Sequence, residues 1–66
     1  MLKLEIERRK RGWSQADLGE RLLYTGAHIS QLELGRIPIE RINRRFRHAL
    51  ELALGLSLEE LLTEVE

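Results

Sequence analysis

The chain has 66 residues, 42% of them hydrophobic and 33% charged, which is the composition of a folded domain and not of a disordered segment. A chain this short forms one domain at most, here residues 1–66, and buries too little surface to build a sizeable catalytic cleft. Its formal net charge is +0, and the absence of cysteine excludes disulfides and thiolate metal sites.

The first two predicted helices cover residues 2–11 and about 15–22. Leu4 and Arg8 lie one helical turn apart, and Gly12 follows at the position of a residue that ends a helix. Alternation of Leu2, Leu4 and Ile6 also fits a short strand, but no neighbouring segment offers a partner strand. The second helix is indicated by Ser14 and Asp17, which have the spacing of a capping box with Asp in place of Glu.

Three more helices are predicted over about 26–33, 39–54 and 58–64. Thr25 and Ser57 are suited to cap the third and the fifth, while Gly35 and Gly55 follow the third and the fourth. Apolar residues recur at helical spacing along 39–54, and four basic side chains fall away from that stripe: Arg41, Arg44, Arg45 and His48. The sequence therefore predicts an all-α domain, a compact bundle of five helices.

The short connection between helices 15–22 and 26–33 requires a tight, angled pair. Gly19 lies in the middle of the first of these helices, where glycine costs about 1 kcal/mol relative to alanine. This cost indicates a packing reason, namely that a Cβ at Gly19 would hold the two helices apart. Such a pair is a helix-turn-helix.

The other side of helix 26–33 is small or polar and carries no fixed charge. Such a face suits close approach to base edges in a major groove, where Gln can pair with adenine. An ordinary exposed helix is the alternative, and a solvated His28 would need no special role. The residues concerned are Gly26, Ala27, His28, Ser30 and Gln31.

Charge is distributed unevenly along the chain. All 11 Lys and Arg lie in residues 1–48 with six acidic residues, so this part carries a net charge of +5 and residues 49–66 carry −5. A polyanion would be attracted to the first part and repelled by the second. A thermostable surface of interleaved Arg and Glu would have a similar composition and remains the alternative. No apolar run approaches the roughly 20 residues of a membrane span and no signal-peptide core is present, so we expect a cytoplasmic protein without a membrane partner.

Three segments carry a resemblance to a known family: RGWSQADLGERL, HISQLELGR and LALGLSLEELL. Together they resemble the helix-turn-helix domain of Cro and the phage repressors, the XRE family of bacterial and phage transcription regulators, from Leu4 to about Leu62. The resemblance implies a lambda-repressor-like fold that binds double-stranded DNA through its third helix.

The resemblance also implies roles for individual positions. Arg8 and Glu33 match an Arg–Glu pair that ties the first helix to the end of the third. Ala27, His28 and Gln31 match base-reading positions, with Gly26 and Ser30 beside them. The implied phosphate contacts are Gln15 and Arg36, with Ser14 and Thr25 at helix N-termini, where backbone N–H groups favour phosphate oxygens. Arg41 and Arg44 have no counterpart in the family pattern and are added as candidate phosphate contacts from the lengthened segment between Gly35 and Gly55.

The chain departs from the family pattern in three places. Leu23 occupies a turn position that is usually Gly, so either a strained positive φ or a different turn is expected. The stretch from Gly35 to Gly55 is longer than in compact members, which we interpret as an extra turn on the fourth helix whose arginines face the DNA backbone or a partner domain. Leu34 is apolar where a phosphate-contacting residue is common, and with Leu52 it indicates a subunit contact.

The leading hypothesis is a sequence-specific transcriptional regulator, a repressor or controller that acts as a homodimer on a palindromic operator. The apolar C-terminal segment is the expected dimer surface, although it can equally serve only to close the core. No cofactor and no small-molecule ligand are expected. The candidate dimer residues are Leu34, Leu52, Leu56, Leu58, Leu62 and Val65.

Two other classes of function are alternatives to a DNA-binding regulator. A protein-interaction module, such as an antitoxin-like or accessory regulator, would bind a protein partner through the Leu- and Glu-rich C-terminal segment. An enzyme is the least supported class, because His28 and His48 have no cysteine or carboxylate cluster at metal-ligand spacing. Ser14 and Ser57 are explained as caps and Ser30 as a helix-surface residue, so neither a catalytic residue nor a metal site is expected.

Overall fold

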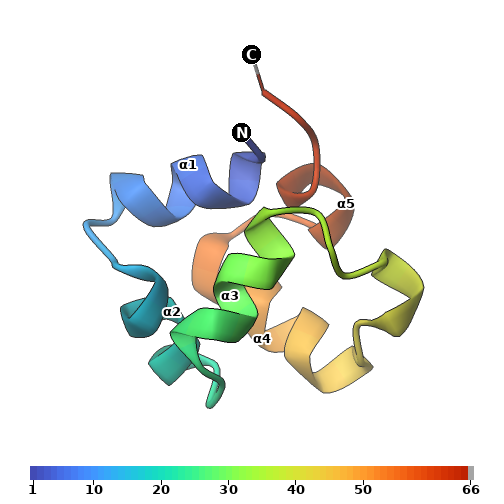
Figure 1. Ribbon diagram of the computed structural model, residues 1–66, viewed down its shortest axis with the longest axis horizontal. Helices are drawn as coiled ribbons and strands as arrows, with labels where there is room; N and C mark the ends of the chain where they lie inside the picture. Colours follow the sequence, from blue (N-terminus) through green and yellow to red (C-terminus); the bar gives the residue numbers. More distant parts are fainter. Residues whose placement is uncertain (66) are drawn as a thin grey trace.

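A computed structural model describes residues Met1–Val65 (Figure 1). Its regular elements are α1 (Lys3–Lys10), α2 (Gln15–Arg21), α3 (Gly26–Glu33), the 3-10 turn η1 (Ile39–Arg41), α4 (Arg44–Leu54) and α5 (Leu58–Leu61). The expected all-α class with five α-helices is confirmed. Within the described range, no helix combines the length and the apolar character that a bilayer crossing needs.

One apolar core holds the five helices together. Its ten side chains are at most 6% exposed, and every α-helix contributes at least one of them. Burial of apolar area is worth about 25 cal/mol per Å², so a core this small has little reserve against a lost side chain. The core residues are Leu4, Leu18, Leu22, Ile29, Leu32, Phe46, Leu50, Leu54, Leu58 and Leu61.

Helices α1, α2 and α3 end in the same hydrogen-bonded turn, in which a left-handed residue follows the helix. Gly12 and Gly35 hold this position after α1 and α3, both with φ of 73°. Leu23 holds it after α2 with φ of 62°, and its N–H donates to the carbonyl of Glu20 while the N–H of Tyr24 donates to that of Gly19. The expected alternative of a positive φ at Leu23 is thus confirmed.

The crossing of α2 and α3 explains two glycines. A Cβ at Gly19 would lie 2.7 Å from the carbonyl carbon of Thr25, closer than real side chains approach backbone. A Cβ at Gly26 would lie 3.0 Å from the backbone nitrogen of Ala16. The predicted packing reason for Gly19 is confirmed, and residues 22–25 have the connection length of a helix-turn-helix.

The prediction of one continuous helix over 39–54 is wrong. Ile42 is extended, with φ of −83° and ψ of 119°, and separates η1 from α4. The side chain of Asn43 then accepts a 2.7 Å hydrogen bond from the N–H of Phe46 and begins a new helix. Asparagine is among the best N-cap residues, because its side chain satisfies a backbone N–H that has no partner within the helix.

The last helix is also shorter than the predicted 58–64. It ends at Leu61, and the chain then runs beside the N-terminus, with an isolated antiparallel bridge between Leu2 and Glu64. The N–H of Lys3 donates to the carbonyl of Thr63 and that of Val65 to the carbonyl of Met1, at 2.9 and 2.8 Å. Residues 63–65 therefore lie beside the first residues of the chain (Figure 1).

We expect Leu23→Gly to raise the free energy of unfolding by about 0.5–1 kcal/mol, because a left-handed backbone costs a residue with a Cβ more than it costs glycine. The Leu23 side chain is 93% exposed, so its removal sacrifices almost no packing. Urea unfolding followed by circular dichroism measures the change. Leu23→Ala is the matched control, since it removes the side chain but keeps the Cβ; an equal gain in both variants would contradict backbone strain.

Candidate nucleic-acid interface

A buried ion pair joins α1 to the end of α3. The Nε of Arg8 donates to Glu33 Oε2 at 2.6 Å, and its Nη2 donates to Oε1 at 3.2 Å. The two residues are only 6% and 8% exposed. These hydrogen bonds raise the pKa of Arg8 above its ordinary value. The pair inferred from the family resemblance is therefore confirmed.

The same network reaches the start of α2. The Nη1 of Arg8 donates to the carbonyl of Trp13 at 2.7 Å, and the Nε2 of Gln15 donates to Glu33 Oε1 at 3.0 Å. Three helices and the α1–α2 connection are thus attached to one charged cluster. Gln15, a predicted phosphate contact, also has this structural role, and its amide keeps a second N–H that this bond does not use.

The outer face of α3 is formed by Ala27 and Gln31. Both residues are exposed, and residues four positions apart lie on the same side of a helix. Ser30, another predicted base-reading residue, is half-buried beside them. Gly26 is half-buried and faces the backbone of α2, so its contribution is to the crossing of the two helices.

His28, another predicted base-reading residue, is half-buried, and its ring lies against aromatic side chains of two other segments. Its ring is 4.7 Å from the ring of Tyr24 and 5.1 Å from that of Phe46, and the Tyr24 and Phe46 rings are 4.5 Å apart. Phe46 falls within the apolar stripe predicted along 39–54, whereas Tyr24 was not among the predicted site residues. No spacing rule connects the α2–α3 turn with the start of α4, so this cluster could be found only from the fold.

The two helix N-termini predicted as phosphate contacts are capped by their own hydroxyls. Ser14 Oγ accepts from the N–H of Asp17 at 3.0 Å, and Thr25 Oγ1 accepts from the N–H of His28 at 3.2 Å. Each hydroxyl hydrogen remains able to donate to another acceptor. The backbone N–H of Ser14 in turn lowers the pKa of Asp17, so a negative charge persists at the start of α2 and opposes an anion there.

Basic residues at the two ends of the chain are largely paired, whereas those between α3 and α4 are not. Arg9 pairs with Glu5, Lys10 and Arg11 with Glu7, and Arg47 with Glu51 and Glu59. Among residues 1–65, five exposed arginines have no carboxylate within ion-pair distance: Arg21, Arg36, Arg41, Arg44 and Arg45. Arg21 instead lies over the ring of Trp13, 4.2 Å from its centroid. The other four follow α3, so positive charge without a local counterion gathers in that segment.

The candidate dimer residues differ widely in exposure. Leu34 and Leu52 are 60% and 73% exposed, which is unusual for leucine in a folded domain. Leu56, Leu62 and Val65 are half-buried. Leu58 is fully buried in the core and cannot contribute to a surface, so its assignment as a dimer residue is wrong. Its inward position follows from the turn of α5, which packs it beside Leu61.

Comparisons with models of protein families, with curated proteins and with solved structures find no match to this chain. Three features stand out: a helix-turn-helix arrangement of α2 and α3, an exposed uncharged face on α3, and unpaired arginines in the segment after it.

We expect Glu33→Gln to lower the free energy of unfolding by about 3 kcal/mol, because it leaves the buried guanidinium of Arg8 without a counterion. Urea unfolding measures the loss. Glu5→Gln is the matched control: it breaks the pair with Arg9, whose side chain is 62% exposed, and should cost less than about 1 kcal/mol. Similar losses in the two variants would contradict a special role for the buried pair.

Proposed function

We propose that this protein is a sequence-specific regulator that binds double-stranded DNA through α3. The observation that carries the proposal is the pair Ala27 and Gln31, exposed and uncharged on a helix that a buried ion pair holds in place. A reading helix must present short polar and small side chains at a fixed angle, because base edges lie at the bottom of a groove.

Gln31 is the side chain best suited to read a base. Its amide can donate to N7 or accept from N6 of adenine, and both contacts together distinguish adenine from the other bases. Ala27, one helical turn earlier, leaves room for close approach and can contact the methyl group of thymine. Together they would read neighbouring positions of one half-site.

The unpaired arginines supply the attraction that DNA binding requires. Arg36 immediately follows the turn that ends α3, and Arg41 and Arg44 belong to η1 and α4. Cations without a local carboxylate release DNA counterions when they approach phosphates, which is the main sequence-independent source of affinity. Gln15, held by Glu33, would add a neutral phosphate contact at the start of α2.

Two copies bound to a palindromic site would place their α3 helices about 34 Å apart, one turn of DNA. A single module of this size makes few contacts, and pairing two half-sites raises affinity without new kinds of contact. Leu34 and Leu52 are two of the exposed large apolar side chains, and they would contribute to such pairing.

A protein-interaction module is the second candidate, and the exposure of large apolar side chains favours it. Leu23 and Leu52 are 93% and 73% exposed, and both contribute apolar surface without contacting the core. In this alternative, the acidic C-terminal part or the α2–α3 turn binds another protein and DNA binding is secondary.

Selection of duplexes from a random pool is expected to yield a palindromic consensus. On the selected duplex, Gln31→Ala should weaken binding by about 1–3 kcal/mol and relax the preference at one position of each half-site, with little effect on random DNA. Arg36→Ala is the matched variant: it should weaken binding to selected and random duplexes alike. Equal losses on both duplexes for both variants would contradict the assignment of reading and anchoring roles.

The affinity for the selected duplex should fall as the salt concentration rises. The slope of the logarithm of the association constant against the logarithm of the salt concentration should be on the order of −5 to −10 for a dimer that touches several phosphates in each half-site. Arg36→Ala should reduce the magnitude of that slope by about 1 for each half-site. Fluorescence anisotropy over a range of salt concentrations gives both values. Failure to bind any duplex at low salt, together with a salt-insensitive complex with a protein, would favour the interaction module.

A further inference from the structure

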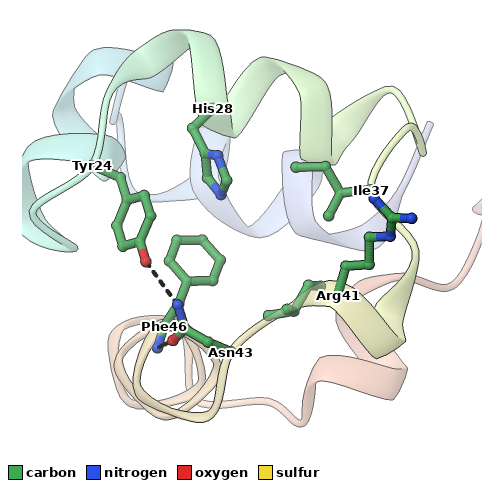
Figure 2. A pocket seen from close by; sticks show the side chains of 7 residues that line it. Tyr24, His28, Ile37, Arg41, Asn43 and Phe46 are labelled. Carbon is green, nitrogen blue, oxygen red and sulfur yellow. Dashed lines mark hydrogen bonds between the residues drawn. The ribbon is translucent and has the colours of Figure 1, made fainter.

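A small hollow lies between α3 and the η1–α4 segment. The rings of Tyr24, His28 and Phe46 form one side of it (Figure 2). Asn43 fixes the arrangement, because its Nδ2 donates to the Tyr24 hydroxyl at 3.1 Å while its Oδ1 accepts from the backbone of Phe46. The aromatic side is therefore held in place by hydrogen bonds and by ring contacts.

The opposite side of the hollow combines aliphatic surface with one positive charge. Ile37 and Ile42 supply the aliphatic part, and Figure 2 shows the guanidinium of Arg41 at the edge beside Ile37. No carboxylate lines the hollow, and among the residues described Arg41 has no ion-pair partner. The site therefore favours an anion and disfavours a cation.

We propose that this hollow binds a small aromatic carboxylate with a single ring, such as benzoate. Its volume of about 130 Å³ is close to that of an apolar cavity of roughly 150 Å³ that holds one benzene ring. One six-membered ring would fill it, with its faces and edges against Tyr24, His28 and Phe46.

The carboxylate of such a ligand matches the guanidinium of Arg41. Guanidinium and carboxylate form two parallel, charge-assisted hydrogen bonds, which are stronger than hydrogen bonds between neutral groups. The planar ring and the charge at its edge thus correspond to the two different sides of the hollow. An aliphatic acid would pair with Arg41 but would not pack against the aromatic rings. An uncharged aromatic compound would pack against the rings but would not pair with Arg41.

Ligand binding does not require DNA, but the proposed function gives it a consequence. Arg41 is a candidate phosphate contact, so a carboxylate bound to it would compete with the DNA backbone and lower DNA affinity. This second step rests on the proposed DNA binding, whereas the ligand site itself does not. Measurement on the free protein therefore tests the site separately.

Titration of the free protein with benzoate, followed by NMR of the aromatic side chains, tests the proposal. The signals of Tyr24, His28 and Phe46 should shift and saturate with a dissociation constant on the order of 1 mM. Arg41→Gln should weaken benzoate binding about tenfold or more, because it removes a charge-assisted contact. Arg45→Gln is the matched control: it removes a neighbouring exposed arginine that does not line the hollow and should leave the affinity unchanged.

Acetate and benzyl alcohol are the control ligands. Acetate has the carboxylate without the ring, and benzyl alcohol has the ring without the charge. Both should bind at least about tenfold more weakly than benzoate. Shifts that stay linear in benzoate up to tens of millimolar would overturn the proposal. So would equal binding of benzyl alcohol and benzoate, or an equal loss of affinity in Arg41→Gln and Arg45→Gln, since neither result leaves a specific role for the Arg41 guanidinium.

Discussion

The buried ion pair between Arg8 and Glu33 is the constraint on which the placement of α3 depends. Its two side chains come from α1 and the last residue of α3, and through Trp13 and Gln15 the same charges hold the start of α2. Two charges removed from water must satisfy each other with good geometry, so few relative positions of these helices are acceptable. A small hydrophobic core by itself would tolerate more relative positions of the helices, because the attraction between apolar surfaces does not depend on direction.

The helix-turn-helix then depends on two close approaches and one strained residue. Gly19 and Gly26 let the backbones of α2 and α3 come together, while Leu23 accepts a left-handed conformation to make the turn between them. Each of these features costs the chain some free energy on its own. They persist because the ion pair and the shared core side chains Leu18, Leu22 and Ile29 require the same crossing angle.

The distribution of positive charge on the surface depends on which basic residues already form ion pairs. Pairs on α1 and between α4 and α5 neutralise most of the basic residues at the two ends of the chain. The arginines after α3 have no such partners, so a protein of zero net charge still presents positive charge at one place. Both the proposed DNA contact and the proposed carboxylate site draw on this charge, with Arg41 belonging to both.

The sequence by itself determined the local features of this protein. These are the helices over 15–22 and 26–33, their respective caps Ser14 and Thr25, and the glycines that end helices. Each depends only on residues within one or two turns of one another. The Arg8–Glu33 pair was predictable only through a family resemblance, since the two residues are 25 positions apart. The tertiary structure alone decided that Asn43 divides the predicted fourth helix and that residues 63–65 run beside the start of the chain. It also decided that His28 turns toward Tyr24 and Phe46, because the direction of a side chain on a helix depends on which other elements pack against it.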